Sequence, residues 1–308
     1  EKKKKINEAV NKVKDSDAYE PIWFRGHNSC KYKVLPSLFR MKDNDNGGFY
    51  KEITLRTAME SLYKSFTVKA FGASEIYQGG ENSLIGILAS MQHYSVPTNI
   101  LDWTPEVFVA LYFAVEDYIV FGESERLNYV APKEDAELWI LNPIRLNHAR
   151  EVLTNRPIDK LNVEKYPILS IVDEKSYRGY IPFSESNEDY DLPIAVYVPH
   201  INQRIKAQAG TFTMFSLDSK AKYSDEDNDY FEDLVEIQAR YKEYKEYKPF
   251  LTSVRISKKC IYEVADWLRN MGIAKPRIYP ELDNISRALT AEIKNYWDKV
   301  EENNGTIT

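Results

Sequence analysis

The sequence predicts an α+β fold, a single domain whose helical N-terminal half packs on a mixed, mainly antiparallel sheet. Three observations favour this class. Helical apolar spacing dominates the first 120 residues, strand-like patterns dominate the second half, and no clean linker separates the two. We therefore expect an N-terminal helix or extension at residues 1–19, one domain at residues 20–296 and a flexible tail at residues 297–308.

The composition is typical of a soluble protein with a substantial core. Of the 308 residues, 43% are hydrophobic, and 41 basic against 47 acidic residues give a net charge of −6. This net charge argues against a protein that binds nucleic acid over much of its surface, but it does not exclude a local basic groove. Cys30 and Cys260 are far apart and no zinc-ligand spacing occurs, so we expect no metal site. Because no run of 18 apolar residues and no signal-peptide core is present, we expect a cytoplasmic protein with no membrane contact.

The first element is a short charged helix within residues 1–18, followed by a buried strand at residues 22–24. Arg25 and Gly26 come directly after this strand, and Gly26 allows a turn or a close approach of another backbone. A buried arginine is costly unless it pairs with a carboxylate or a phosphate. Two interpretations of Arg25 remain open, a structural Arg–Asp pair and a contact with a ligand.

Helices are expected over the next stretch. Residues 35–38 predict a turn into a short helix, and apolar residues at helical spacing predict a long helix over residues 49–70. Another helix is expected to begin at residue 82 or 83 and to end near residue 94 or 95, because Pro97 disfavours helical backbone before it.

The chain is organised around residues 91–114, which join two apolar helices. Polar side chains between buried helices need partners or a ligand, and this segment carries His93, Thr98, Asp102 and Thr104. His93 lies in the last turn of its helix, where the dipole favours imidazolium, and either faces solvent or lines a cleft.

A strong helix start is expected at Thr104, with Pro and Glu in the following two positions. The helix that follows is apolar on nearly all sides and is expected to be central in the core. Asp102 precedes the expected cap, so the helix dipole favours its ionised form and makes it a partner for an arginine, a ribose hydroxyl or an amide. The structural alternative is that Asp102 neutralises Arg25.

The second half of the chain supplies the strands. They are expected at residues 137–141, 192–198, 211–215, 234–237 and 250–256, with an acidic loop over residues 218–233. A helix over residues 257–272 follows. A last helix over residues 281–296 is expected to bury Leu282, Ile285, Leu289 and Ile293.

Several well-known catalytic motifs are absent from the sequence. It contains no glycine-rich phosphate loop, no HExxH, no clustered Cys and His and no Gly-x-Ser-x-Gly elbow. Any chemistry must therefore come from dispersed Arg, His, Asp, Thr and Gln side chains.

Several segments resemble the FRG domain, a bacterial family named for its Phe-Arg-Gly signature. They are Phe24–Gly26, Leu35–Arg40, Gln92–Thr104, Ala110–Ala114, Arg204, Gln208–Phe212 and Tyr279–Asp283. The resemblance spans residues 20–290, and one departure is Asn99, where the family usually has Arg.

The resemblance implies that the protein is a component of a bacterial or phage-related defence or toxin locus. The Arg25-Gly26 pair is also similar to the first-strand Arg of ADP-ribosyltransferases, which contacts NAD. Gln208 falls where such enzymes carry a late strand with a catalytic Glu, so the usual carboxylate is missing.

Three hypotheses follow. In the first, the chain is an ADP-ribosyltransferase or NAD glycohydrolase with NAD as substrate and a nucleic acid or a protein as acceptor. Its catalytic residues would be His93, Asp102 and Gln208, and its ligand-binding residues Arg25, Gly26, Thr98 and Arg204. In the second, the same cleft is a non-catalytic sensor that binds a nucleotide, a nucleic acid or a phage protein. In the third, these residues form a buried polar network that fixes the fold. The sequence does not specify an oligomeric state.

Overall fold

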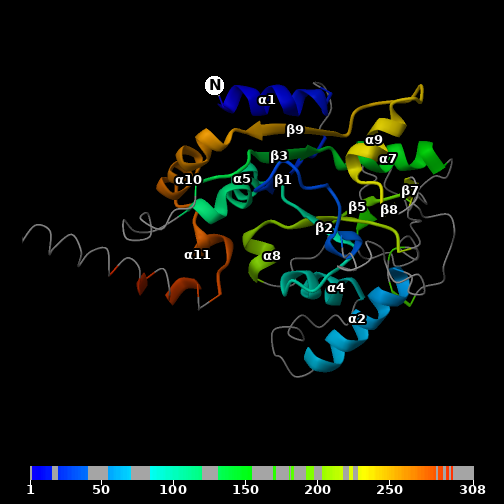
Figure 1. Ribbon diagram of the computed structural model, residues 1–308, viewed down its shortest axis with the longest axis horizontal. Helices are drawn as coiled ribbons and strands as arrows, with labels where there is room; N and C mark the ends of the chain where they lie inside the picture. The colour runs from blue at the N-terminus through cyan, green and yellow to red at the C-terminus, as the bar shows by residue number, and fades with distance from the viewer. Residues whose placement is uncertain are drawn as a thin grey trace, which may run out of the picture.

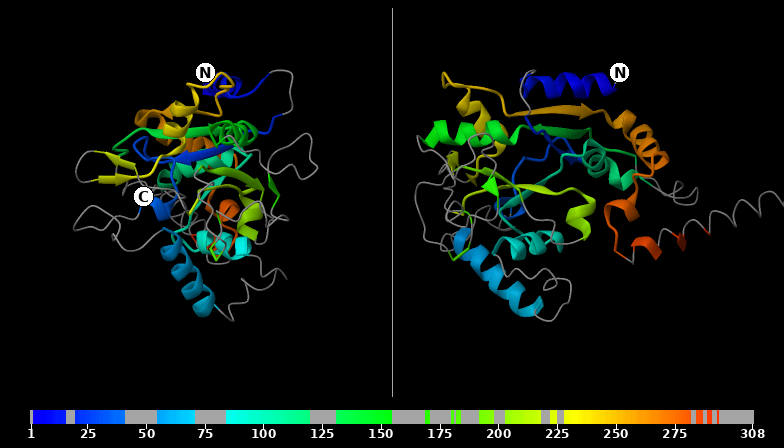
Figure 2. Two further views of the ribbon diagram at one scale, coloured as in Figure 1. Left: turned by 90° about the vertical axis from the view of Figure 1, so that its right-hand side faces the viewer. Right: turned by 180° about the vertical axis from the view of Figure 1, so that it is seen from behind.

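The computed structural model contains two main β-sheets with helices packed against them. It describes residues 2–15, 20–40, 55–70, 84–119, 131–154, 169–170, 180, 182–183, 192–197, 203–217, 222–224, 228–281, 284–286, 289–290 and 293. Its layers run from α1 (Lys2–Lys12) through two sheets to α2 (Leu55–Ala70), and the view from behind shows the same order (Figures 1 and 2). The fold class predicted from the sequence is confirmed, but the main strands form two sheets instead of one.

The first sheet has the order β1-β3-β9 and is antiparallel throughout. Its strands are β1 (Trp23–His27), β3 (Ala136–Leu141) and β9 (Leu251–Ile256). Side chains alternate between the faces of a strand, and the set that includes Leu138 and Ile140 packs in one core with α1, α5 (Val107–Val115) and α10 (Ile261–Asn270). A short 3-10 turn, η4 (Lys258–Cys260), leads into α10.

The second sheet has the order β2-β6-β5-β4. Its strands are β2 (Ile100–Trp103), β6 (Thr211–Met214), β5 (Ile194–Tyr197) and β4 (Leu169–Ser170), of which β4 and β5 are parallel. It shares the larger core with α2, α4 (Leu84–His93), α7 (Pro143–Thr154), α9 (Leu234–Tyr241) and the 3-10 turn η1 (Ser37–Arg40). Near its edge lie α8 (Gln203–Ala207) and α11 (Lys275–Ile278).

An arginine on α7 ties the N-terminal segment to the body of the domain. Arg145 is 5% exposed, and its guanidinium reaches Glu20 at 3.1 Å, Asp15 at 2.9 Å and the Pro249 carbonyl oxygen at 3.3 Å. Since two carboxylates and a carbonyl surround it, this guanidinium has a full set of protein partners.

The connection at the centre of the chain differs from the prediction in two ways. Residues 100–103 form strand β2, which was not predicted. The helix after it begins at Val107 with Glu106 as the N-cap, and Thr104 instead makes a bridge with Phe24 and accepts a hydrogen bond from the Glu106 backbone N–H. The tertiary bridge between Thr104 and Phe24 therefore overrides the local capping signal at Thr104.

The predicted strand at residues 234–237 is wrong, because these residues begin α9. Asp233 accepts hydrogen bonds from the backbone N–H groups of Val235 and Glu236, and Glu236 accepts one in return from the Asp233 N–H. This capping box is a sequence-level helix signal that outweighs the strand-like apolar pattern. The predicted acidic loop contains a two-stranded pairing of β7 (Lys222–Ser224) with β8 (Asn228–Tyr230).

The last helix was predicted to bury an apolar face, and the structure contradicts this for the residues that it describes. Ile285, Leu289 and Ile293 are 36%, 56% and 59% exposed. The predicted loop at residues 43–48, the start of the predicted helix at residues 49–54 and the predicted tail at residues 297–308 lie outside the described residues. In the part of the chain that the structure describes, no helix combines the length and apolar character needed to cross a membrane.

Candidate functional site

A cavity of about 330 Å³ lies where the two sheets meet. Residues of β1 and β2 form one wall, next to the backbone bridge between Phe24 and Thr104. Further lining residues come from α4, α5 and α8. Six of the seven site residues predicted from the sequence line it: Arg25, Gly26, His93, Asp102, Arg204 and Gln208.

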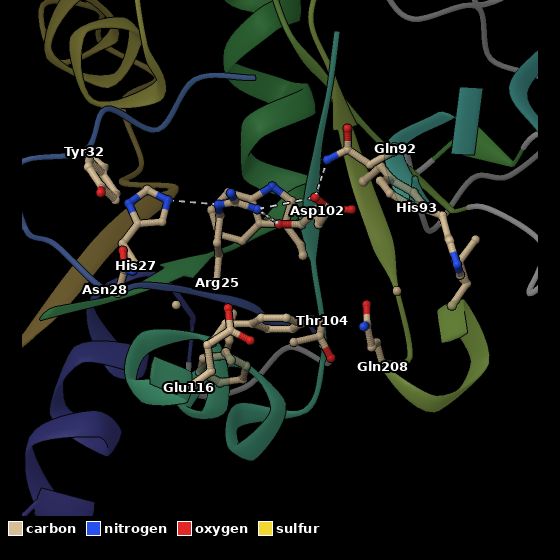
Figure 3. Close-up of a pocket in the computed structure, with 18 of the residues that line it drawn as sticks. Arg25, His27, Asn28, Tyr32, Gln92, His93, Asp102, Thr104, Glu116 and Gln208 are labelled. Atoms are coloured by element: carbon tan, nitrogen blue, oxygen red, sulfur yellow. Dashed lines mark hydrogen bonds and ion pairs between the residues drawn. The ribbon is translucent and has the colours of Figure 1, made fainter. Parts of the chain in front are cut away.

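Each residue of the Phe-Arg-Gly segment has a separate role. Phe24 exchanges two backbone hydrogen bonds with Thr104, of 2.7 and 2.9 Å, which join the two sheets. Gly26 lies directly against α5, and a Cβ there would come within 1.9 Å of the Ala110 carbonyl oxygen and 2.6 Å of the Ala114 nitrogen. The close approach allowed by Gly26 is therefore a packing requirement, whereas Arg25 points into the cavity (Figure 3).

Arg25 is held on two sides. Its Nε donates to His27 Nε2 over 2.9 Å, and its Nη1 donates to the Asp102 carbonyl oxygen over 2.8 Å. The Asp102 carboxylate is looser, 3.7 Å from Nη1 and with a side chain 47% exposed. Among the described residues Nη2 donates no hydrogen bond, so an edge of the guanidinium remains for a ligand in the cavity (Figure 3).

His27 is neutral and was missed by the sequence analysis. Burial and, to a smaller extent, the charges of Arg25 and Arg40 lower its pKa from 6.5 to about 3. Because a guanidinium can only donate, Nε2 must be the lone-pair nitrogen, and the imidazole proton is on Nδ1. The Trp139 indole nitrogen lies 3.2 Å from Nδ1. Because both nitrogens carry a proton in this tautomer, they are in contact but form no hydrogen bond. His27 therefore positions Arg25 without adding charge.

Gln92 and Thr98 form a chain of hydrogen bonds that ends at the Asp102 carboxylate. Gln92 Nε2 donates to Asp102 Oδ2 over 2.5 Å, and Gln92 Oε1 accepts a hydrogen bond from Thr98 Oγ1. Thr98 is fully buried and lies outside the lining of the cavity, so the structure gives it an indirect role through Gln92. Asn99 is also fully buried and donates to the Tyr180 and Phe215 carbonyl oxygens, which makes it a structural residue.

The cavity has a positive lining in a protein of net negative charge. Its basic side chains are Arg25, Lys33, Arg40 and Arg204, against the acidic Asp102 and Glu116. Burial lowers the pKa of Arg25, and the nearby Asp102 opposes this change. A guanidinium stays protonated in either case. The local basic groove that the composition left open is therefore present, and it suits an anionic ligand.

His93, Arg204 and Gln208 lie in another part of the cavity lining. Arg204 Nη1 donates to the His93 carbonyl oxygen over 3.2 Å, and Glu281 Oε1 lies 3.6 Å from His93 Nε2. Gln208 sits in the turn between α8 and β6, and its Nε2 donates to the Ile278 carbonyl oxygen over 3.2 Å. The predicted site residues thus form two separate groups that line one cavity, one with Arg25 and Asp102 and the other with His93, Arg204 and Gln208 (Figure 3).

Glu116 is a second residue that the sequence analysis missed. It follows the last residue of α5 in the 3-10 turn η2 (Glu116–Tyr118) and lines the cavity. The Tyr279 hydroxyl donates to its Oε2 over 2.9 Å, and the Arg204 guanidinium lies over the Tyr279 ring at 4.3 Å. Burial is the main cause of a raised pKa at Glu116, while the Tyr279 hydrogen bond lowers it. A Glu at a helix C-terminus was the available signal, because the dipole disfavours an anion there.

The comparisons with known proteins add one finding. A family model described as the FRG domain matches residues 20–121, which include the Phe-Arg-Gly segment, Asp102 and Glu116. The comparisons with curated proteins and with solved structures found no match. The matched part ends before Arg204 and Gln208, so the family resemblance of those residues stays a prediction. Residues 20–121 of the chain are an FRG domain.

Proposed function

We propose that the cavity binds a nucleotide through its phosphate groups and that the protein uses NAD as a substrate. The observation that carries the proposal is the open edge of Arg25, held in place by His27 and Asp102 and close enough to Arg40 for their charges to interact. A fixed guanidinium can bind a phosphate through two parallel hydrogen bonds. The volume of about 330 Å³ is near the lower end for small-molecule sites, which suits one nucleotide unit in the enclosed part.

In the proposed reaction the bond between the ribose C1′ and the nicotinamide nitrogen breaks, and its electron pair passes to the nicotinamide. A water or an acceptor oxygen or nitrogen forms the new bond to C1′ and releases its proton to solvent. The rate gain would come from positioning and from electrostatic support of an oxocarbenium-like state. A nucleic acid or a protein is the expected acceptor, and bacterial defence or toxicity is the expected setting.

One observation favours a second candidate, a nucleotide sensor without catalysis. The amide nitrogen of Gln208 is engaged with the Ile278 carbonyl oxygen, and a Gln cannot replace the carboxylate of a transferase. A sensor would use the same Arg25 site and release no nicotinamide.

Turnover and binding separate these candidates. Wild type, Arg25→Lys and the surface control Arg240→Lys are incubated with NAD, with and without lysate protein and nucleic acid, and released nicotinamide is measured. We expect release by wild type and the control and about a tenfold or larger loss in Arg25→Lys, because lysine keeps the charge but not the planar fork. NAD binding without any release would establish the sensor. Absence of NAD binding would contradict the use of NAD, and absence of ADP binding as well would contradict the nucleotide sensor.

A further inference from the structure

The cavity contains a carboxyl group whose position is costly for folding. Glu116 lies at the C-terminal end of α5, where the helix dipole disfavours negative charge, and Asp117 follows it. Burial raises the pKa of Glu116, and the charge of Asp117 raises it further. Local rules of stability are most often broken at functional sites.

Glu116 has one direct hydrogen-bond partner among the described residues. The Tyr279 hydroxyl donates to Oε2 over 2.9 Å, which leaves Oε1 for a group in the cavity. Tyr279 is 163 positions away in the sequence, so the contact joins the C-terminal segment to the end of α5. The charges of Lys275 and Arg204 lower the pKa of Glu116 from a distance, but no hydrogen bond joins either side chain to it among the described residues. A partly buried carboxylate whose one hydrogen-bond partner is neutral is less satisfied than a purely structural carboxylate would be.

The surrounding side chains keep Tyr279 in the form that donates. Burial and the charge of Glu116 raise the pKa of Tyr279, so its phenol stays protonated. Arg204 lies over the ring at 4.3 Å, and the Tyr112 ring meets it edge-on with centroids 6.2 Å apart. The phenol is therefore fixed, and it directs the carboxyl of Glu116 while lowering its pKa.

We propose that Glu116 is the catalytic carboxylate of the cavity, and that it accepts a hydrogen bond from a ribose hydroxyl of the nucleotide whose phosphate Arg25 binds. This inference rests on the proposed function and assigns to Glu116 the carboxylate that Gln208 cannot supply. The ionised group also stabilises the positive charge that develops on the ribose when the nicotinamide leaves. Arg25 and Glu116 line the same cavity from β1 and from the end of α5 (Figure 3).

The test combines an isosteric variant with a matched control. Glu116→Gln removes the charge in the cavity, and Glu106→Gln removes the same charge from an exposed position at the other end of α5, outside the lining of the cavity. We expect nicotinamide release to fall about 100-fold or more in Glu116→Gln and to stay within about threefold of wild type in Glu106→Gln. Thermal unfolding of both variants confirms that they fold. Activity of Glu116→Gln within a few-fold of wild type would overturn the proposal.

Tyr279→Phe tests the catalytic role of Glu116 with a measurement that a purely structural role of Glu116 would leave unchanged. The Tyr279 hydrogen bond lowers the pKa of Glu116, so its removal raises that pKa. Since the ionised carboxylate is the active form, the acid limb of the pH–rate profile should move to higher pH in Tyr279→Phe. An unmoved acid limb would contradict a role for the ionised form of Glu116.

A binding cycle separates this inference from the proposed reaction. The affinities of wild type and Glu116→Gln are measured for NAD and for its analogue without the 2′-hydroxyl of the nicotinamide ribose. We expect loss of the hydroxyl to weaken wild type about tenfold and the variant clearly less. If wild type releases no nicotinamide but this coupling is present, the NAD-cleaving activity fails and the Glu116–ribose contact stands. If the hydroxyl matters equally in both proteins, the contact with Glu116 is overturned.

Discussion

Two inward-facing arginines of this protein differ in how fully their hydrogen bonds are satisfied. The side chain of Arg145 is 6% exposed and lies between Asp15, Glu20 and the Pro249 carbonyl oxygen. The side chain of Arg25 is 20% exposed, its nearest carboxylate oxygen is 3.7 Å away, and one edge of its guanidinium has no partner among the described residues. The same residue type therefore stabilises the fold in one place and presents an anion site in the other.

The largest expected effect is on stability, and it should separate the two arginines. Arg145→Met leaves the largely buried Glu20 without its cationic partner and should cost about 3–5 kcal/mol in the free energy of unfolding. Arg25→Met leaves a half-exposed Asp102 that water can reach, so it should cost less than about 1.5 kcal/mol. Chemical denaturation of both variants measures the difference. Equal losses would make Arg25 a structural arginine and favour the hypothesis of a buried polar network.

As the pH is lowered, the Arg25 region should lose stability at a higher pH than the Arg145 region. The folded pKa of His27, about 3, lies below its ordinary 6.5, so protons bind the unfolded state preferentially and stability falls as pH drops below 6.5. Between pH 8 and pH 4.5 this amounts to about 2–3 kcal/mol. Near Arg145, hydrogen bonds and charges lower the pKa of Asp15 from 3.8, so that contribution is lost only below about pH 4.

His27→Gln keeps an acceptor for Arg25 but cannot bind the proton, so it should flatten this pH dependence. The half-exposed His148→Gln is the matched control and should retain it. The free energy of unfolding of the three proteins, measured from pH 8 to pH 4.5, decides the matter. An unchanged slope in His27→Gln would mean that His27 is protonated in the folded state.

The smallest expected effect extends the comparison to carboxyl groups. Glu20 accepts hydrogen bonds from Arg145, whereas Glu116 has only the Tyr279 phenol among the described residues. Because the folded pKa of Glu116 is raised, stability falls as the pH rises above the ordinary value of 4.5, and the loss is complete above the folded pKa. Glu116→Gln should therefore stabilise the protein at pH 7.5 by about 0.5–2 kcal/mol and have little effect at pH 4. Glu20→Gln should destabilise it at pH 7.5, and a loss of stability in both variants would contradict the contrast.

Local patterns predicted those parts of the site that are close in the chain. The apolar strand before Arg25 and the polar segment around Asp102 indicated the two segments that together form one wall of the cavity. The sequence did not reveal strand β2, because Ile100–Trp103 is short and its pairing with β6 is more than 100 residues away. Thr104 carried a strong capping signal, but the backbone bridge to Phe24 uses it in another way.

Residues joined over long separations account for what sequence reasoning missed. Glu116 follows a helix whose sequence is apolar on nearly all sides and so indicated only a core element. Its partner Tyr279 comes from the other end of the chain. His27 was not among the predicted site residues, because nothing local in the sequence indicates that Arg25 donates to it. By contrast, the helix at residues 234–241 had a visible signal, the capping pair of Asp233 and Glu236, which outweighed the apolar pattern.

The central claim is that the open edge of Arg25 binds the phosphate of a nucleotide. Calorimetric titration of NAD into wild type and Arg25→Met tests it most directly, with adenosine as a probe that lacks phosphate. We expect NAD to bind wild type and to bind Arg25→Met about 10- to 100-fold more weakly, from the loss of about 1.5–3 kcal/mol in charged hydrogen bonds. Adenosine should bind both proteins alike. Equal NAD affinity in the two proteins, with both folded, would contradict the claim.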